Sequence, residues 1–250
     1  MGKYGDVRLK KKEEILWQRI FERKSVSLNQ IGLDWAEVMS FYRFLNNRRV
    51  GLAEVIENEI GRHWLNEVKG HVLAISDTTS INLEGHRGRL RVEGLGYIGG
   101  GAGQKIGFHL HPSLVISADN FQILGLSSVP VWVRPEVNKE RKGKYKQLPI
   151  EEKESNKWLR AAAESKRHLP VAQMITVIGD RESDVYEEFA RVPDERTHLL
   201  LRSCQNRRLM DGGSLYERLA EQRVAGEYEI EIEADARVGR ENRRAQIEAR

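Results

Sequence analysis

The sequence predicts a mixed α/β protein: a sheet with flanking helices, preceded by a small all-helical region. Three observations support this. Apolar residues recur at helical spacing in the first third of the chain, short apolar runs rich in β-branched residues begin at His71, and strand and helix patterns alternate after residue 150. A chain of 250 residues is long enough for one large domain and a small one.

The composition is typical of a soluble globular protein, with 31% charged and 7% aromatic residues. No apolar run reaches the length of a membrane span. The N-terminal residues lack the apolar core of a signal peptide, so a cytoplasmic protein is expected. Cys204 is the single cysteine, which excludes an internal disulfide and a thiolate zinc cluster.

Positive charge is concentrated at the N-terminus. The net charge is +4, and residues 1–50 hold eleven Lys or Arg against six Asp or Glu. A basic arm on a near-neutral body suggests contact with a polyanion. A solvated helix face of mixed charge is the alternative interpretation, and the charge count alone does not separate the two.

The N-terminal region is expected to form three helices. Arg8–Arg23 has a broad apolar stripe, Asp34 caps a second helix that runs to residue 47, and Leu52–Val68 is amphipathic. Short helices with arginines near a helix terminus are compatible with a small DNA-binding unit. The arginines at the end of the second helix are Arg43, Arg48 and Arg49.

Strand and helix patterns follow from His71 onward. Strands are predicted over His71–Ser76, Leu90–Glu93 (a short hairpin arm), Phe108–Ser117, Gln122–Arg134, Ala172–Gly179 and His198–Ser203. Helices are predicted over Glu151–His168, Glu182–Arg191 and Ser214–Gln222. Glu227–Glu233 and Arg244–Arg250 alternate between apolar and polar residues, and the chain stops inside the second run. The predicted divisions are therefore 1–69 (helical), 70–225 (α/β core) and 226–250 (start of a β-subdomain).

Two sequence features invite a functional interpretation that their context does not support. Gly94–Gly99 matches the dinucleotide-binding pattern, but more glycine and then a strand follow it instead of a helix, so a loop is expected. His109 and His111 share one face of a strand. Hydrogen-bonded histidines near a polar cleft are the favoured interpretation there, ahead of metal binding.

Two aspartates are the most informative residues. Asp77 and Asp180 each directly follow an apolar strand. Carboxylates that converge at strand ends suit Mg²⁺ or Mn²⁺. Two such ions, about 3.5–4 Å apart, can catalyse phosphodiester cleavage, a chemistry that wants a third carboxylate. The alternative is that Asp77 caps a turn and Asp180 caps a helix, and spacing alone favours these caps.

Several separated motifs occur in the order found in one family. DTTS follows a strand, EKESNKWLRAAAES lies in a helix and GDRESDVYEEF contains the second aspartate, while GDVRLKKK and FYRFLNNRRV lie near the N-terminus. Over nearly its whole length the chain resembles the insertion-sequence-four family of bacterial DDE transposases, of transposon-five type. The resemblance implies a ribonuclease-H-like core in which Asp77 and Asp180 are the first two acids of a Mg²⁺- or Mn²⁺-binding triad.

The same resemblance implies the partners and the DNA contacts. Arg202 falls where the family has an arginine that contacts transposon-end DNA, and Lys157 and Arg160 are expected to face DNA as well. The arginines at positions 43, 48 and 49 fall in the segment that recognises terminal repeats. The implied activity is DNA cleavage and strand transfer on double-stranded transposon ends and target DNA, carried out in the family by a homodimer.

The chain also departs from the family pattern. The third acid of the family lies in a Y-x-x-R-x-x-x-E-x-x-x-x-x-x-K helix that nothing here matches, and Glu233 and Glu241 lie in the wrong element. The dimerisation helices are likewise unmatched. The sequence is therefore expected to be the front part of a transposase, truncated at its C-terminus with an incomplete core. A catalytically inactive DNA-binding fragment is the alternative.

Overall fold

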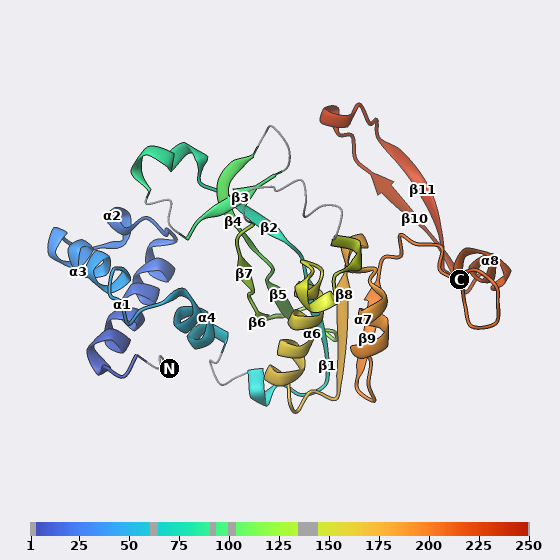
Figure 1. Cartoon of the computed structure of the whole chain (residues 1–250), viewed down its shortest axis with the longest axis horizontal. Coiled ribbons are helices and arrows are strands. Elements are labelled where there is room, and N and C mark those ends of the chain that lie inside the picture. The colour runs from blue at the N-terminus through green and yellow to red at the C-terminus, as the bar shows by residue number, and fades with distance from the viewer. Residues whose placement is uncertain (1–3, 61–64, 91–93, 100–103, 135–144, 250) are drawn as a thin grey trace. The chain divides into compact units, whose positions relative to one another are not determined.

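The structure is a computed structural model that describes residues 4–60, 65–90, 94–99, 104–134 and 145–249 (Figure 1). It confirms an α/β fold with a mixed sheet and flanking helices. The chain divides into two compact units, Met1–Arg202 and Ser203–Arg250.

The first unit begins with helices that enclose a small apolar core. They are α1 (Val7–Arg23), α2 (Leu28–Ile31), α3 (Trp35–Leu45) and α4 (Leu52–Ile60). As predicted, Asp34 caps α3, because its side chain accepts a hydrogen bond from the Glu37 backbone N–H at 2.7 Å. The buried cluster consists of Tyr4, Leu16, Ile31, Phe41 and Phe44.

The third predicted helix is shorter than the sequence suggested. Its pattern ran from Leu52 to Val68, but α4 ends at Ile60 and a 3-10 turn, η1, covers Leu65–Glu67, while residues 61–64 lie outside the described residues. The one-turn helix α2 was not predicted. Gly32 at its end has no room for a Cβ, which would meet Val38 Cγ2 at 2.4 Å, so the turn into α3 packs tightly.

A five-stranded mixed sheet forms the centre of the first unit. Its strand order is β6 (Ile123–Ser128), β5 (Ser113–Ser117), β1 (His71–Ser76), β8 (Met174–Gly179) and β9 (Thr197–Leu201). The β6–β5–β1 neighbours are antiparallel and the β1–β8–β9 neighbours are parallel. The helix α6 (Asn156–His168) precedes β8, and α7 (Tyr186–Arg191) connects β8 to β9, as parallel strands require a crossover (Figure 1).

The core of this sheet follows the alternation of its strands. In β1 every second side chain is buried, and the inward positions of the neighbouring strands meet the same layer. Helix α6 adds small side chains that let it approach the sheet closely. The buried cluster includes Val72, Ala74, Val115, Ala162, Ile175 and Val177.

A second, smaller sheet contains β2 (Thr79–Asn82), β4 (Lys105–Leu110) and β3 (Gly96–Ile98), and β7 (Val131–Trp132) also pairs with β4. The sequence did not predict β2 or β3. Both are short, and β2 is polar and mostly exposed, so no apolar run marks it.

Two of the predicted strands were wrong, because each is divided into two strands in the structure. Phe108–Ser117 is not one strand, because a corner at His111–Pro112 sends β4 and β5 into different sheets. Gln122–Arg134 breaks before Pro130 into β6 and β7. Proline has no N–H for a ladder and is confined to strand ends and edges, which explains both breaks.

Other predicted boundaries moved by a few residues. The helix expected over Glu151–His168 begins as α6 at Asn156, after a 3-10 turn η5 (Ile150–Glu152). The helix expected over Glu182–Arg191 is a 3-10 turn η6 (Arg181–Ser183) followed by α7. Of the predicted hairpin arm at 90–93, residues 91–93 lie outside the described residues, and Leu90 follows a 3-10 helix η2 (Glu84–Arg89).

The second unit contains α8 (Leu215–Glu221) and a β-hairpin of β10 (Gly226–Ile232) and β11 (Arg243–Ala249). The helix and both alternating runs were predicted, and Ser214 with Glu217 forms a capping box at the start of α8. A 3-10 turn, η7 (Ala236–Val238), lies between the two strands. Across the ranges that the structure describes, every helix falls short of the length and apolar character needed to traverse a bilayer.

Candidate functional site

Three sequence-predicted site residues line up at one edge of the five-stranded sheet. The parallel pairing of β1 with β8 matches Ile75 with Ile178, and the same register continued by two residues matches Asp77 with Asp180. The pairing of β8 with β9 likewise continues to match Asp180 with Arg202. Since neighbouring strands lie about 4.8 Å apart, an acid–acid–arginine row extends along the carboxyl ends of three adjacent strands.

Asp77 lies at a corner where the chain leaves the five-stranded sheet for the smaller one. Its backbone N–H donates to the Pro112 carbonyl at 3.4 Å. The carboxylate is exposed, and its Oδ1 accepts a hydrogen bond from the Thr78 backbone N–H at 2.7 Å. The turn therefore orients one carboxylate oxygen.

Asp180 occupies the equivalent place after β8. It is exposed and extended, with φ −82° and ψ −165°, and caps the turn η6 by accepting from the Glu182 N–H at 2.9 Å. Arg202 follows β9, and its backbone N–H donates to the Gly179 carbonyl at 3.2 Å. Both aspartates therefore also accept the backbone hydrogen bonds that the alternative interpretation as caps expects. These bonds use only one oxygen of each carboxylate.

Two acids, not three, directly follow the adjacent strands β1 and β8 at this end of the sheet. Among the residues that the structure describes, no group of three His, Cys, Asp or Glu side chains is placed to hold a metal ion. Glu233 and Glu241, which the sequence analysis set aside, belong to the second unit. A divalent ion held by Asp77 and Asp180 would therefore take its remaining ligands from water or from another molecule.

A layer of aromatic and cationic side chains contacts the turn that Asp180 caps. Lys157 on α6 is only 9% exposed, its ammonium pairs with Glu182 at 3.0 Å, and it lies over the rings of Trp132 and Trp158. Arg160, on the same helix, is exposed. The two basic residues predicted to face DNA thus differ: Arg160 is open to solvent, whereas Lys157 already has an acidic partner.

His111 belongs to this buried layer. It is completely buried, and its ring meets the Trp158 ring edge-on at 4.4 Å. Burial, with the nearby Lys157 ammonium, lowers the pKa of His111 to about 4, and Asp180 opposes this weakly. The imidazole is therefore neutral at pH 7.

A second buried polar contact lies beneath the turn after Asp180. Ser183 Oγ donates to Glu188 Oε2 at 2.8 Å, and both side chains are fully buried. Burial raises the pKa of the Glu188 carboxyl to about 7, against an opposing effect of the Ser183 hydrogen bond. The buried carboxyl of Glu188 was not predicted from the sequence. Glu187 and Glu188 are adjacent glutamates, and only the structure shows that Glu188 is the one whose side chain is fully buried.

The two histidines behave as the sequence analysis favoured. His109 Nδ1 lies 2.9 Å from Ser80 Oγ, and His111 Nδ1 lies 2.9 Å from Thr78 Oγ1. The first contact crosses the β2–β4 ladder, and the second lies just beyond its end. The matching period-two spacing of hydroxyls at 78 and 80 and of histidines at 109 and 111 was the signal in the sequence that could have revealed this pairing.

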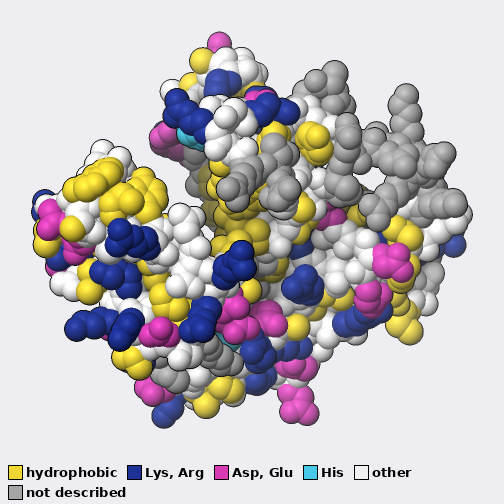
Figure 2. Space-filling view, turned by 60° about the vertical axis from the view of Figure 1, so that its left-hand side comes forward, with side chains coloured by type: hydrophobic (Ala, Val, Ile, Leu, Met, Phe, Trp, Pro, Cys, Tyr) yellow, Lys and Arg dark blue, Asp and Glu magenta, His cyan; other side chains and the backbone are white. Residues whose placement is uncertain are grey.

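The predicted DNA-recognition arginines are all exposed. Arg43 lies in the last turn of α3, and Arg48 and Arg49 lie in the turn between α3 and α4. Figure 2 shows dark blue Lys and Arg side chains interspersed with magenta Asp and Glu over the visible face. Basic groups are thus available at the surface within a pattern of mixed charge.

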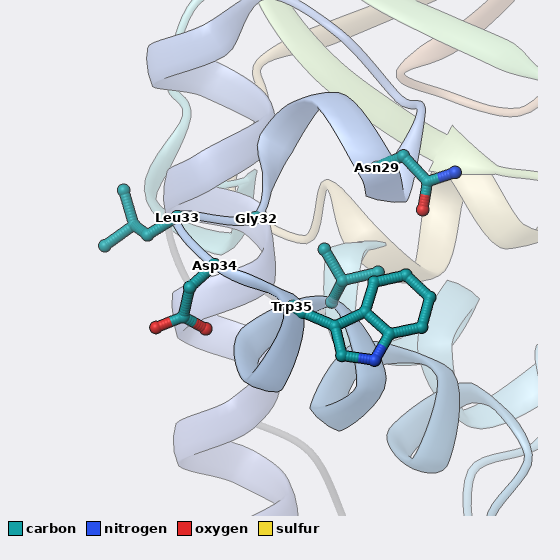
Figure 3. Close-up of a pocket in the computed structure, with 6 residues that line it drawn as sticks. Asn29, Gly32, Leu33, Asp34 and Trp35 are labelled. Carbon is teal, nitrogen blue, oxygen red and sulfur yellow. The ribbon is translucent and has the colours of Figure 1, made fainter.

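A pocket lies at the turn between α2 and α3, which is far in the sequence from Asp77 and Asp180. In Figure 3, Asn29 and Trp35 extend to one side of this turn, and Leu33 and Asp34 point to the other. Trp35 is 70% exposed. The acid of this pocket, Asp34, is already used as the cap of α3, so the pocket offers no carboxylate pair comparable to that of the sheet.

No family model matches this chain.

Proposed function

We propose that this protein is a DNA-binding protein of the DDE transposase type, with a ribonuclease-H-like core in which Asp77 and Asp180 are the first two metal-binding acids. The observation that supports the proposal is the β1–β8 register: extended by two residues beyond its last pair, Ile75–Ile178, it aligns Asp77 with Asp180 at the carboxyl ends of the two strands. Independent turn or helix caps would have no reason to be register partners on adjacent strands.

Three further features support the proposal. The sheet combines an antiparallel half with a parallel half joined by helices, as a ribonuclease-H-like core requires. Arg202 extends the row beside Asp180, where it can bind a phosphate with its guanidinium group. The N-terminal helices carry exposed arginines at positions 43, 48 and 49 for contact with duplex DNA.

The donor chemistry of the acid pair fits Mg²⁺ or Mn²⁺. Both carboxylates are exposed hard-oxygen donors, and within the described part of the chain only one oxygen of each accepts a hydrogen bond. A bound divalent ion would supply a Lewis acid for phosphodiester cleavage. Asp77 and Asp180 would hold the ion, while Arg202 and Arg160 would orient the DNA backbone.

Metal binding is the most direct test of this proposal. Mn²⁺ titrations followed by electron paramagnetic resonance compare the wild-type chain with Asp77→Asn and Asp180→Asn. Each change removes one of two charged ligands, so we expect the affinity to fall by roughly tenfold or more. The matched control is Asp119→Asn, an exposed aspartate in the turn after β5, where the antiparallel strand ends at the opposite edge. Equal binding by all four proteins contradicts the proposal.

DNA binding is tested by the salt dependence of fluorescence anisotropy on a labelled duplex. Replacing all three exposed arginines by Gln should weaken binding and reduce the salt slope by about 0.9 for each phosphate that is no longer neutralised. The test variant is the triple change Arg43→Gln, Arg48→Gln and Arg49→Gln.

A matched control removes the same charge from arginines that already pair with acids. Their guanidinium groups bond to Glu84, Glu164 and Glu151, so we expect a much smaller change in the salt slope. The control variant is the triple change Arg87→Gln, Arg167→Gln and Arg191→Gln. Equal reductions in affinity in the two triple variants would show nonspecific attraction and count against a recognition role for the N-terminal arginines.

DNA binding without catalysis is the second candidate function. It is favoured because, among the described residues, no third acid joins Asp77 and Asp180 in a group that could hold a metal ion. A nicking assay on plasmid DNA with Mn²⁺ separates the two. Retarded DNA without nicks supports the binding function, and nicks that disappear in Asp180→Asn support the enzyme.

A further inference from the structure

The chain crosses between its two sheets at two neighbouring corners. The first corner, Asp77–Thr78, connects β1 to β2, and the second, His111–Pro112, connects β4 to β5. The corners bond to each other through the backbone, since Asp77 N–H donates to the Pro112 carbonyl at 3.4 Å. They also bond through side chains, because Thr78 Oγ1 lies 2.9 Å from His111 Nδ1.

His111 is the more buried partner in this contact. It is fully buried, packs edge-on against Trp158 at 4.4 Å, and its backbone N–H donates to the Pro130 carbonyl at 3.0 Å. Within the described ranges its Nε2 atom finds no hydrogen-bond partner, so the contact with Thr78 is where the ring meets another polar side chain. A polar ring is normally tolerated in such a position only where it has a defined partner.

A chain of two hydrogen bonds connects His111 to the Asp77 carboxylate. His111 Nδ1 fixes the Thr78 hydroxyl, and the Thr78 backbone N–H donates to Asp77 Oδ1 at 2.7 Å. Asp77 itself is exposed and directly follows the last residue of β1, so the bond from Thr78 is the contact that orients its carboxylate.

We infer that His111 is a positioning residue, which acts through Thr78 to hold the Asp77 carboxylate beside Asp180 for a divalent cation. The inference rests on the metal site of the proposed function. Groups that orient a metal ligand in this way affect the affinity for the ion without touching it.

The same ladder contains a built-in control. Two register positions further along, Ser80 Oγ lies 2.9 Å from His109 Nδ1, and His109 is also buried and stacks on Trp132. The chemistry and the bond length match those of the Thr78–His111 pair. The difference is that Ser80 lies three residues from Asp77 and does not hold its carboxylate.

The experiment measures Mn²⁺ affinity of the full chain by electron paramagnetic resonance. Thr78→Val removes the hydroxyl at nearly constant shape, and we expect affinity to fall about 10- to 100-fold. Thr78→Ser restores the hydroxyl and should recover most of that affinity. His111→Leu should act like Thr78→Val, and combining the two should add little, because both remove the same hydrogen bond.

Ser80→Ala, which removes the equivalent hydrogen bond of His109, should leave Mn²⁺ affinity within about twofold of wild type. The unfolding midpoint of every variant is measured alongside. If His111→Leu does not fold, Thr78→Val and Thr78→Ser still test whether the Thr78 hydroxyl supports Mn²⁺ binding.

Two results overturn the inference while leaving the proposed function intact. Either Thr78→Val binds Mn²⁺ like wild type although Asp180→Asn does not, or Ser80→Ala weakens binding as much as Thr78→Val. Absence of Mn²⁺ binding by the wild-type chain overturns both the inference and the metal site on which it rests.

Discussion

The five-stranded sheet and the β10–β11 hairpin are built from the same kind of alternating sequence but have opposite surroundings. In β1 every second side chain is buried, and Ala74 is completely inaccessible. In β10 the corresponding apolar side chains are open to solvent, with Tyr228 57% and Ile230 37% exposed. The apolar side chains of β1 pack in a core, whereas those of β10 are largely open to solvent.

This difference shows what alternation specifies. It determines which side chains share a face of a strand, but a covering layer decides whether that face becomes a core. The sheet is covered by α6 and other elements, so its strands, including the two that Asp77 and Asp180 follow, pack into a core. An isolated two-stranded hairpin is marginally stable in water.

Hydrogen exchange should show the largest contrast between the two regions. We expect central amides of β1 and β8 to exchange only through global unfolding, on the order of 5–15 kcal/mol. Amides of β10 and β11 should exchange through local opening at a small fraction of that free energy. Mass spectrometry of the exchanging protein measures both, and equal protection of the hairpin would break the comparison.

Matched side-chain truncations in β8 and β10 should give the second largest difference between the two regions. Ile175 in β8 is fully buried, so Ile175→Ala should reduce the free energy of unfolding by about 2–5 kcal/mol. Ile230→Ala in β10 removes the same atoms from a partly exposed face and should cost less than about 1 kcal/mol. Urea denaturation measures both, and similar reductions would mean that β10 is covered in solution.

The buried carboxyl of Glu188 gives the first unit a pH dependence. Its pKa is raised by burial from 4.5 to about 7, so the folded state binds the proton more tightly than the unfolded chain. This favours folding fully below about pH 4.5, and the contribution is lost as pH rises through 7. The effect is about 1.4 kcal/mol for each unit of pKa difference.

Glu188→Gln keeps a neutral acceptor for Ser183 and should remove this dependence. Its advantage in unfolding midpoint over wild type should grow between pH 4.5 and 7 and then stay constant. The comparison variant is Glu231→Gln, an exposed position in β10. A constant difference between Glu188→Gln and wild type over this range would mean that Glu188 is not buried as described.

The smallest effect is expected in the hairpin. Arg244 lies across from Glu229 and Glu231 at 3.2 and 3.3 Å, and its side chain is 68% exposed. Arg244→Gln should change the free energy of unfolding of the second unit by no more than about 1 kcal/mol, and the change should vanish in 1 M NaCl. A larger, salt-independent effect would mean that these ion pairs are shielded from solvent.

The sequence predicted the edge of the sheet better than its corners. An apolar run that ends in an aspartate identified β1 and β8, which Asp77 and Asp180 directly follow. The corner at His111–Pro112 was missed because apolar alternation continues through it. A change of sheet alters the direction of the backbone but leaves the side-chain pattern unchanged.

Buried polar contacts were harder to predict than the acids they support. Thr78 and Ser183 look like turn residues in the sequence, and their partners His111 and Glu188 lie 33 and 5 residues away. Only tertiary packing makes one glutamate of α7 fully buried. The ends of buried strands can thus be predicted from sequence, whereas buried polar contacts depend on how sheets and helices meet.

Diffraction from crystals soaked in Mn²⁺ tests the central claim most directly, through anomalous density recorded near the manganese absorption edge. We expect a peak that contacts a carboxylate oxygen of Asp77 and one of Asp180, and its disappearance in crystals of Asp180→Asn. A structure in which those two carboxylates face apart, with Mn²⁺ bound elsewhere or not at all, would contradict it.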